Sequence, residues 1–230
     1  MAAEAHSTAT LRLTVGDLRI VHPITVPSGP VAAADLMPAL QGLVNAVVEA
    51  AEAGKQVSCR KGCGACCRQL VPVSRTEGER LLSVVEAMPR ERRKILGARF
   101  AAAEAAISAA GLKDRGQRTD RELSTSYFAL GVPCPFLEEE SCSIHPERPL
   151  VCREYLVTSP AELCAGPAQE GVAPVAVPKV SMAARGLQSE GEDWFPLALL
   201  MDWAKKRPRK GERRTGPEWV QRFLRAVGGA

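Results

Sequence analysis

Large apolar side chains are scarce in this sequence of 230 residues. Only ten residues are aromatic, and 34 of those counted as hydrophobic are alanine. No stretch approaches the roughly 18 consecutive apolar residues of a membrane span. Residues 1–10 have no basic start, apolar run or small-residue cleavage site, so no secretion signal is indicated. We therefore expect a folded, soluble, cytoplasmic protein with no membrane partner.

The motifs of several common enzyme classes are also missing. The sequence contains no Gly-x-Ser-x-Gly, no P-loop, no dinucleotide fingerprint and no His-Glu-x-x-His. These absences argue against the serine hydrolases, nucleotide-dependent enzymes and zinc proteases that use such motifs. They favour a protein that is not an enzyme, without settling the question.

Positive charge is concentrated in one short run. Residues 205–214 hold seven basic residues and one acidic residue, which gives this run a net charge of +6. The whole chain has a net charge of +4, so the residues outside the run sum to −2. The run contains Pro208 and Gly211 and no aromatic residue. This pattern predicts a solvated connector, and nucleic acid is an unlikely partner.

Cysteine is the residue type that is clustered. Four of the eight cysteines fall within nine residues, 59–67, and the others follow singly. Thiolates this dense repel one another or cross-link unless a soft cation holds them, and Cys63-x-x-Cys66 is a spacing by which two sulfurs reach one ion. All eight are therefore candidate metal ligands: Cys59, Cys63, Cys66, Cys67, Cys134, Cys142, Cys152 and Cys164.

A disulfide framework is the main alternative, because an even number of cysteines is typical of secreted scaffolds. The missing secretion signal argues against it. Adjacent Cys66 and Cys67 would also form a strained bond with each other.

The neighbours of the clustered cysteines suit a metal site. We expect Gly62 and Gly64 to adopt positive φ angles, which would turn backbone N–H groups toward sulfur. Arg60, Lys61 and Arg68 would offset negative charge.

Periodicity and capping residues predict a mainly α fold. Alternation around Gly16-Asp17 predicts a short N-terminal β-hairpin, and residues 133–153 form an irregular segment rich in proline. Capping boxes begin at Ser74 and Thr215. The predicted helices are residues 30–53, 75–88, 90–110, 196–205 and 217–227.

We expect three regions along the chain. Residues 1–29 would form a tail and the β-hairpin, and residues 30–165 a small helical cysteine-cluster domain that binds metal. Residues 166–230 would form a connector rich in proline and glycine, the basic run and C-terminal helices that pack on the same body.

The cysteine pattern resembles a known family. Cys59-x3-Cys63-x2-Cys66-Cys67, then Cys134-Pro-Phe-Leu, Cys142-x-Ile, Arg148-Pro149 and Cys152-Arg153, is similar to the zinc- or iron-chelating cysteine-cluster family (YkgJ-like), to which flagellin lysine N-methylases are distantly related. The resemblance covers about residues 59–164 and implies a small, mostly helical bacterial domain that binds metal through cysteine. His145 stands where the family commonly has an aromatic residue, and whether it is a ligand stays open. Arg148 and Arg153 are expected to donate hydrogen bonds near the site.

The number of thiols leaves several cofactors open. Eight thiolates could fill two four-sulfur zinc sites, whereas six or seven suit a shared binuclear site; mononuclear zinc or iron and an iron–sulfur cluster are further alternatives. Cys59-x3-Cys63-x2-Cys66 is also the spacing of radical S-adenosylmethionine enzymes, but no alternating βα pattern follows it. Cys164 is the least certain member of the set.

Three classes of function remain open. We favour a metal-binding protein whose ion is structural, because a structural zinc site supplies about 10–16 kcal/mol, as much as the net stability of a typical domain. The alternatives are an iron–sulfur or metal-dependent enzyme, with redox or protein-methylase-like activity, and a zinc module that binds nucleic acid or a partner protein.

Overall fold

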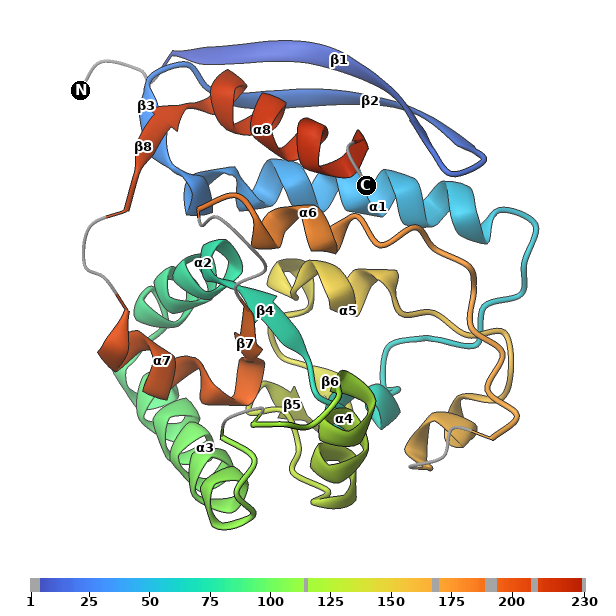
Figure 1. Ribbon diagram of the computed structural model, residues 1–230, viewed down its shortest axis with the longest axis vertical. Coiled ribbons are helices and arrows are strands. Elements are labelled where there is room, and N and C mark those ends of the chain that lie inside the picture. The colour runs from blue at the N-terminus through green and yellow to red at the C-terminus, as the bar shows by residue number, and fades with distance from the viewer. Residues whose placement is uncertain (1–4, 114–115, 167–169, 189–193, 208–210, 229–230) are drawn as a thin grey trace.

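Helices dominate the computed structural model, which describes residues 5–113, 116–166, 170–188, 194–207 and 211–228 (Figure 1). This confirms the prediction of a mainly α fold. None of the described helices is long and apolar enough to cross a membrane. The α-helices are α1 (Met37–Glu52), α2 (Arg75–Glu86), α3 (Arg90–Ala109), α4 (Asp120–Ala129), α5 (Leu150–Glu154), α6 (Ser181–Arg185), α7 (Leu200–Lys206) and α8 (Gly216–Gly228). Short 3-10 turns are η1 (Ala33–Leu36), η2 (Ala65–Arg68), η3 (His145–Glu147), η4 (Ala161–Ala165) and η5 (Leu197–Leu199).

The described strands form antiparallel pairs rather than one continuous sheet. The pairs are β1 (His6–Val15) with β2 (Leu18–Pro27), β3 (Pro30–Ala32) with β8 (Arg213–Thr215), β4 (Pro72–Ser74) with β7 (Trp194–Pro196), and β5 (Leu137–Glu138) with β6 (Ser141–Cys142). The first pair is the predicted N-terminal hairpin. It turns at Gly16, whose φ of 57° suits a residue without a side chain.

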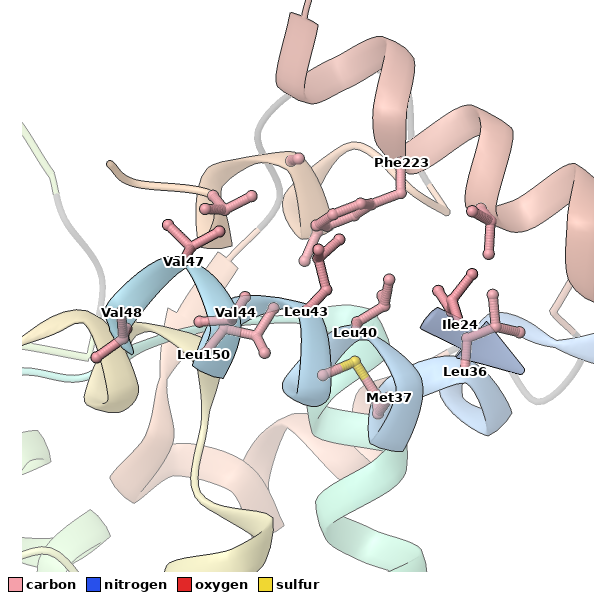
Figure 2. Packing of buried hydrophobic residues seen from close by; sticks show 14 of the residues in the cluster. Ile24, Leu36, Met37, Leu40, Leu43, Val44, Val47, Val48, Leu150 and Phe223 are labelled. Carbon is pink, nitrogen blue, oxygen red and sulfur yellow. The ribbon is translucent and has the colours of Figure 1, made fainter. Parts of the chain in front are cut away.

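The hairpin covers one side of the largest hydrophobic cluster. Ile20, Ile24 and Val26 of β2 are buried against α1 and α8, and the hairpin lies across these two helices in Figure 1. Figure 2 shows Leu43 and Val47 of α1 near Phe223 of α8. The cluster also includes Leu150 of α5, the helix that carries Cys152.

Two further clusters share α3. Its predicted apolar face of Leu96, Phe100, Ala103 and Ile107 is buried, which confirms that periodicity. The first two of these residues pack with α2 and with Phe136, whose ring meets Phe100 edge-on at a centroid distance of 5.4 Å. The last two pack with α4, a helix that the sequence pattern did not predict.

Two predicted helices begin later than expected because strand pairs and short 3-10 turns take their first residues. Residues 30–32 pair with β8, so α1 starts at Met37. In the same way, Trp194–Pro196 pair with β4, and α7 starts at Leu200. The partners lie far away in sequence, so local periodicity carries no sign of either pairing.

The basic run is more ordered than the predicted connector. Lys205 and Lys206 belong to α7, and Arg213 and Arg214 belong to β8. The guanidinium of Arg214 lies 5.7 Å from the centroid of the Trp219 ring. Residues 208–210 of the run lie outside the described residues. Tertiary pairing with β3 therefore gives the end of the run a packing role.

The buried carboxylate of Glu77 joins two helices. It accepts hydrogen bonds from the backbone N–H and the hydroxyl of Ser74, at 2.9 and 2.8 Å, which completes the predicted capping box of α2. Its other oxygen accepts from the backbone N–H of Leu150 at 2.9 Å, at the start of α5. Burial raises the pKa of Glu77, and these hydrogen bonds oppose that shift. One side chain thus ties the position of α5 to that of α2.

Replacing Glu77 by alanine should destabilise the protein by about 3 kcal/mol, because the buried N–H groups of Ser74 and Leu150 would lose their partner. Chemical denaturation measures this change. Glu122→Ala is the matched control, since Glu122 forms the same box with Thr119 on the exposed start of α4. Equal losses in the two variants would show that the link to Leu150 contributes nothing.

Candidate metal centre

Seven of the eight cysteines line a single cavity of about 580 Å³. They come from three parts of the chain: the segment before and within η2, the β5–β6 hairpin with the residues just before it, and α5. All eight cysteines are free thiols. The seven are Cys59, Cys63, Cys66, Cys67, Cys134, Cys142 and Cys152.

Backbone hydrogen bonds hold the first segment in place. The N–H of Ser58 donates to the carbonyl of Val157 at 2.9 Å, which anchors the entry to the cluster. The segment then turns at Gly62, whose φ of 87° confirms one of the two predicted positive angles. The N–H groups of Cys63 and Cys67 each close a tight turn, at 3.1 and 3.0 Å. The local turns therefore space the four sulfurs, and the bond from Ser58 to Val157 anchors the segment to a distant part of the chain.

Gly64 is required for a different reason from the predicted one. Its φ is −99°, which any residue adopts, so the expected positive angle is wrong. A Cβ at this position would lie 2.6 Å from a carboxylate oxygen of Glu140 and 2.7 Å from Cδ1 of Leu137. The absence of a side chain lets the first segment approach the β5–β6 hairpin closely.

The second segment is bonded directly to the first. The N–H of Cys134 donates to the carbonyl of Cys67 at 2.7 Å, and the hairpin then pairs Leu137 with Cys142. The hairpin turn places Glu139 and Glu140 at φ angles of 47° and 54°, in the left-handed region. Both terminal guanidinium nitrogens of Arg68 donate to the Glu140 carboxylate, at 3.0 and 2.7 Å. This ion pair stabilises the turn and keeps Cys142 beside the first segment.

The third segment brings Cys152 on α5. Arg153 is buried, and its Nε and Nη1 donate to the carbonyl of Arg148 at 3.1 Å and to Oδ1 of Asn45 at 2.9 Å. Its Nη2 donates to the carbonyl of Pro146. The prediction that Arg153 donates hydrogen bonds near the site is confirmed. Arg153 fixes the turn before α5 to α1.

Burial favours the protonated form of four of the cavity thiols in the absence of a cation. It raises the pKa of Cys134 to about 12, and it raises the pKa values of Cys59, Cys142 and Cys152 as well. Neighbouring thiols raise these values further, because two thiolates close together repel. A bound cation reverses this balance by favouring the thiolate form.

Cys164 contacts the wall of the cavity through a tyrosine. It is buried, does not line the cavity, and accepts a hydrogen bond from the hydroxyl of Tyr155 at a distance of 4.0 Å. Tyr155 itself lies in the cavity wall. The sequence pattern gave no role to Tyr155, and its only signal was its position one turn after Cys152.

Two other predicted residue groups reach the cavity. His145 lies in its wall, and its pKa is lowered by partial burial and by nearby Arg148 and Arg153, which favours the neutral imidazole. Arg60 and Lys61 also line the cavity from exposed positions. Arg68, which was predicted to offset thiolate charge, forms an ion pair with Glu140 and also lies near Cys67.

The thiol ligands suit zinc or iron, provided that their side chains turn toward a common ion. Sulfur ligands in this number are typical of zinc and of iron–sulfur centres. Within the described ranges, however, no group of three or more His, Cys, Asp and Glu side chains is arranged so that it could hold a metal ion. The thiols surround the cavity without converging, so their side chains would have to turn inward to share an ion.

Gly64→Ala should lower the free energy of unfolding by about 2 kcal/mol, since the new methyl group would collide with Glu140 and Leu137. Thermal unfolding followed by circular dichroism measures the change. Gly97→Ala is the control: it lies in α3 with no atom within 4 Å of the new Cβ, and it should be neutral or stabilising. A Gly64→Ala variant as stable as wild type would contradict the close packing described above.

The comparisons with known proteins bear on the same segment. A family model described as "Putative zinc- or iron-chelating domain" (CxxCxxCC) matches residues 58–169, the part of the chain that contains all eight cysteines. Searches among curated proteins and among solved structures found no match. Residues 58–169 of this chain are therefore similar to the zinc- or iron-chelating CxxCxxCC domain.

Proposed function

We propose that this protein binds zinc or iron through the seven cysteine thiolates of the cavity. One observation carries the proposal: thiols from three separate segments, which no disulfide joins, line the same cavity. The family match supports metal chelation by this part of the chain. The proposed ligands are Cys59, Cys63, Cys66, Cys67, Cys134, Cys142 and Cys152, with Cys164 outside the set.

The number of ligands favours two ions. One tetrahedral ion takes about four sulfurs, so seven thiols exceed the need of a single ion. Two such ions would require about eight coordination positions, and seven sulfurs fill them if one thiolate bridges both ions. A binuclear site of this kind uses every thiol of the cavity and needs no nitrogen ligand from His145.

The proposed role of the metal is structural. The segments that carry the thiols contain little regular structure, and the loop between Cys67 and Cys134 encloses α2, α3 and α4. Closing such a loop through coordinated sulfur removes conformational entropy from the unfolded chain. Filled coordination shells would leave no open position for a substrate. An iron–sulfur cluster held by the same sulfurs is the alternative, and its visible absorption distinguishes it.

Protein purified without oxygen should contain about two zinc or iron ions per chain by elemental analysis. Removing the metal from reduced protein with a strong chelator should lower the thermal midpoint and the helical circular dichroism signal together, because the ligand segments would lose their cross-links. A brown protein with absorbance near 400 nm would indicate the iron–sulfur alternative. Metal-free protein with an unchanged midpoint would refute the structural role, and protein that never binds metal would refute the function.

Cys134→Ser and Cys164→Ser should differ in metal content. Serine replaces sulfur with a harder, smaller donor, so loss of a cavity thiol should reduce the ions bound per chain. Cys164→Ser should retain the wild-type number, because Cys164 does not line the cavity. Neither cysteine is exposed: Cys134 is half-buried and Cys164 is buried. Equal loss of metal would place Cys164 among the ligands.

A further inference from the structure

One side chain in the wall of the cavity carries an unsatisfied donor. The Nε atom of Arg148 is buried and makes no hydrogen bond. A buried donor on a charged group is costly unless something accepts from it, and such atoms are rare in folded proteins. An acceptor that forms only when the cavity is occupied would remove that cost.

The backbone at this residue is held firmly in place. The carbonyl of Arg148 accepts hydrogen bonds from Nε of Arg153 at 3.1 Å and from Nε2 of Gln41 in α1 at 3.4 Å. Pro149 follows directly and caps the start of α5. The side chain therefore enters the cavity from a fixed point, so its position is set by contacts that do not involve the thiols.

Arg148 lies in the same cavity wall as thiols from all three cysteine segments. These thiols include Cys59 and Cys66 of the first segment, Cys142 of the second and Cys152 of the third. Two nearby arginines form salt bridges with carboxylates: Arg68 with Glu140, and Arg80 with Glu147. Among the described residues of the wall, the other cations are Arg60 and Lys61, and both are exposed to solvent, which screens their charge.

The metal-loaded cavity would carry negative charge that Arg148 can offset. Seven thiolates and two divalent ions leave a net charge of about −3. Arg60, Lys61 and Arg148 together offset it. Arg60 and Lys61 are exposed, whereas Arg148 is partly buried and its Nε atom is fully buried, so solvent screens the charge of Arg148 less.

We propose that Arg148 is the partly buried counter-charge of the metal-loaded thiolate cluster, and that its Nε–H donates a hydrogen bond to a thiolate sulfur. This makes Arg148 a positioning residue that raises the affinity of the cavity for its ions. The inference rests on the proposed function, since it concerns the loaded form of the same cavity.

The test compares Arg148→Gln and Arg148→Lys with the control Arg80→Gln. Arg80 forms a salt bridge with Glu147, the residue before Arg148, but does not line the cavity. Each protein is prepared without metal under reducing conditions and titrated with zinc against a chromophoric chelator. Cobalt loading provides a second measurement, because the sulfur-to-cobalt absorption band responds to hydrogen bonds at sulfur.

Arg148→Gln should bind zinc about tenfold or more weakly and should shift the cobalt band. Arg148→Lys keeps the charge but lacks the fixed donor, so it should retain more of the affinity while still shifting the band. Arg80→Gln should match wild type in both measurements. If Arg148→Gln does not fold, the position of the sulfur-to-cobalt absorption band in Arg148→Lys tests the proposal instead.

Three outcomes separate this inference from the function on which it rests. Wild-type affinity and an unshifted band in both Arg148 variants would overturn the role of Arg148 while leaving metal binding intact. Equal weakening in Arg148→Gln and Arg80→Gln would also overturn it, since a general loss of positive charge would then explain the effect. Wild-type protein that binds neither zinc nor cobalt would refute the function itself.

Discussion

The placement of α5 depends on one buried carboxylate. Glu77 accepts hydrogen bonds from Ser74 at the start of α2 and from Leu150 at the start of α5, and its side chain is shielded from water. A buried acceptor with several donors of fixed direction holds its neighbours within a narrow range of geometry. Because Arg148 and Cys152 lie within two residues of Leu150, this contact also positions the wall of the thiol cavity.

The cavity is assembled mainly through main-chain contacts rather than through the thiols. Cys134 donates to Cys67, Ser58 donates to Val157, and Arg153 anchors the turn before α5. None of these contacts needs a metal ion. Such an arrangement brings the sulfurs near one another while burial raises the pKa values of four of them, so ion binding would be accompanied by release of protons. In the function we propose, metal completes a partly formed site.

Local sequence signals predicted the elements whose stabilising contacts are local. The Ser74 and Thr215 boxes and the buried face of α3 depend on residues three or four apart, and all three are confirmed. The starts of α1 and α7 were wrong by several residues, because β8 and β4 pair with the residues that were expected to begin them. Strand pairs between distant segments leave no periodic signal in either partner.

For the site, the sequence by itself determined the chemistry and the tertiary structure decided the geometry. Clustered cysteines and their spacing indicated soft-metal ligation, because ligand type and local spacing are properties of the chain alone. Which cysteines share a cavity depends on how distant segments pack. Cys164 lies outside the wall and contacts it through Tyr155, and Arg68 pairs with Glu140, whereas the Nε donor of Arg148 has no partner. Each of these outcomes depends on tertiary contacts or on burial. Residue spacing in the sequence reveals neither the contacts nor the burial.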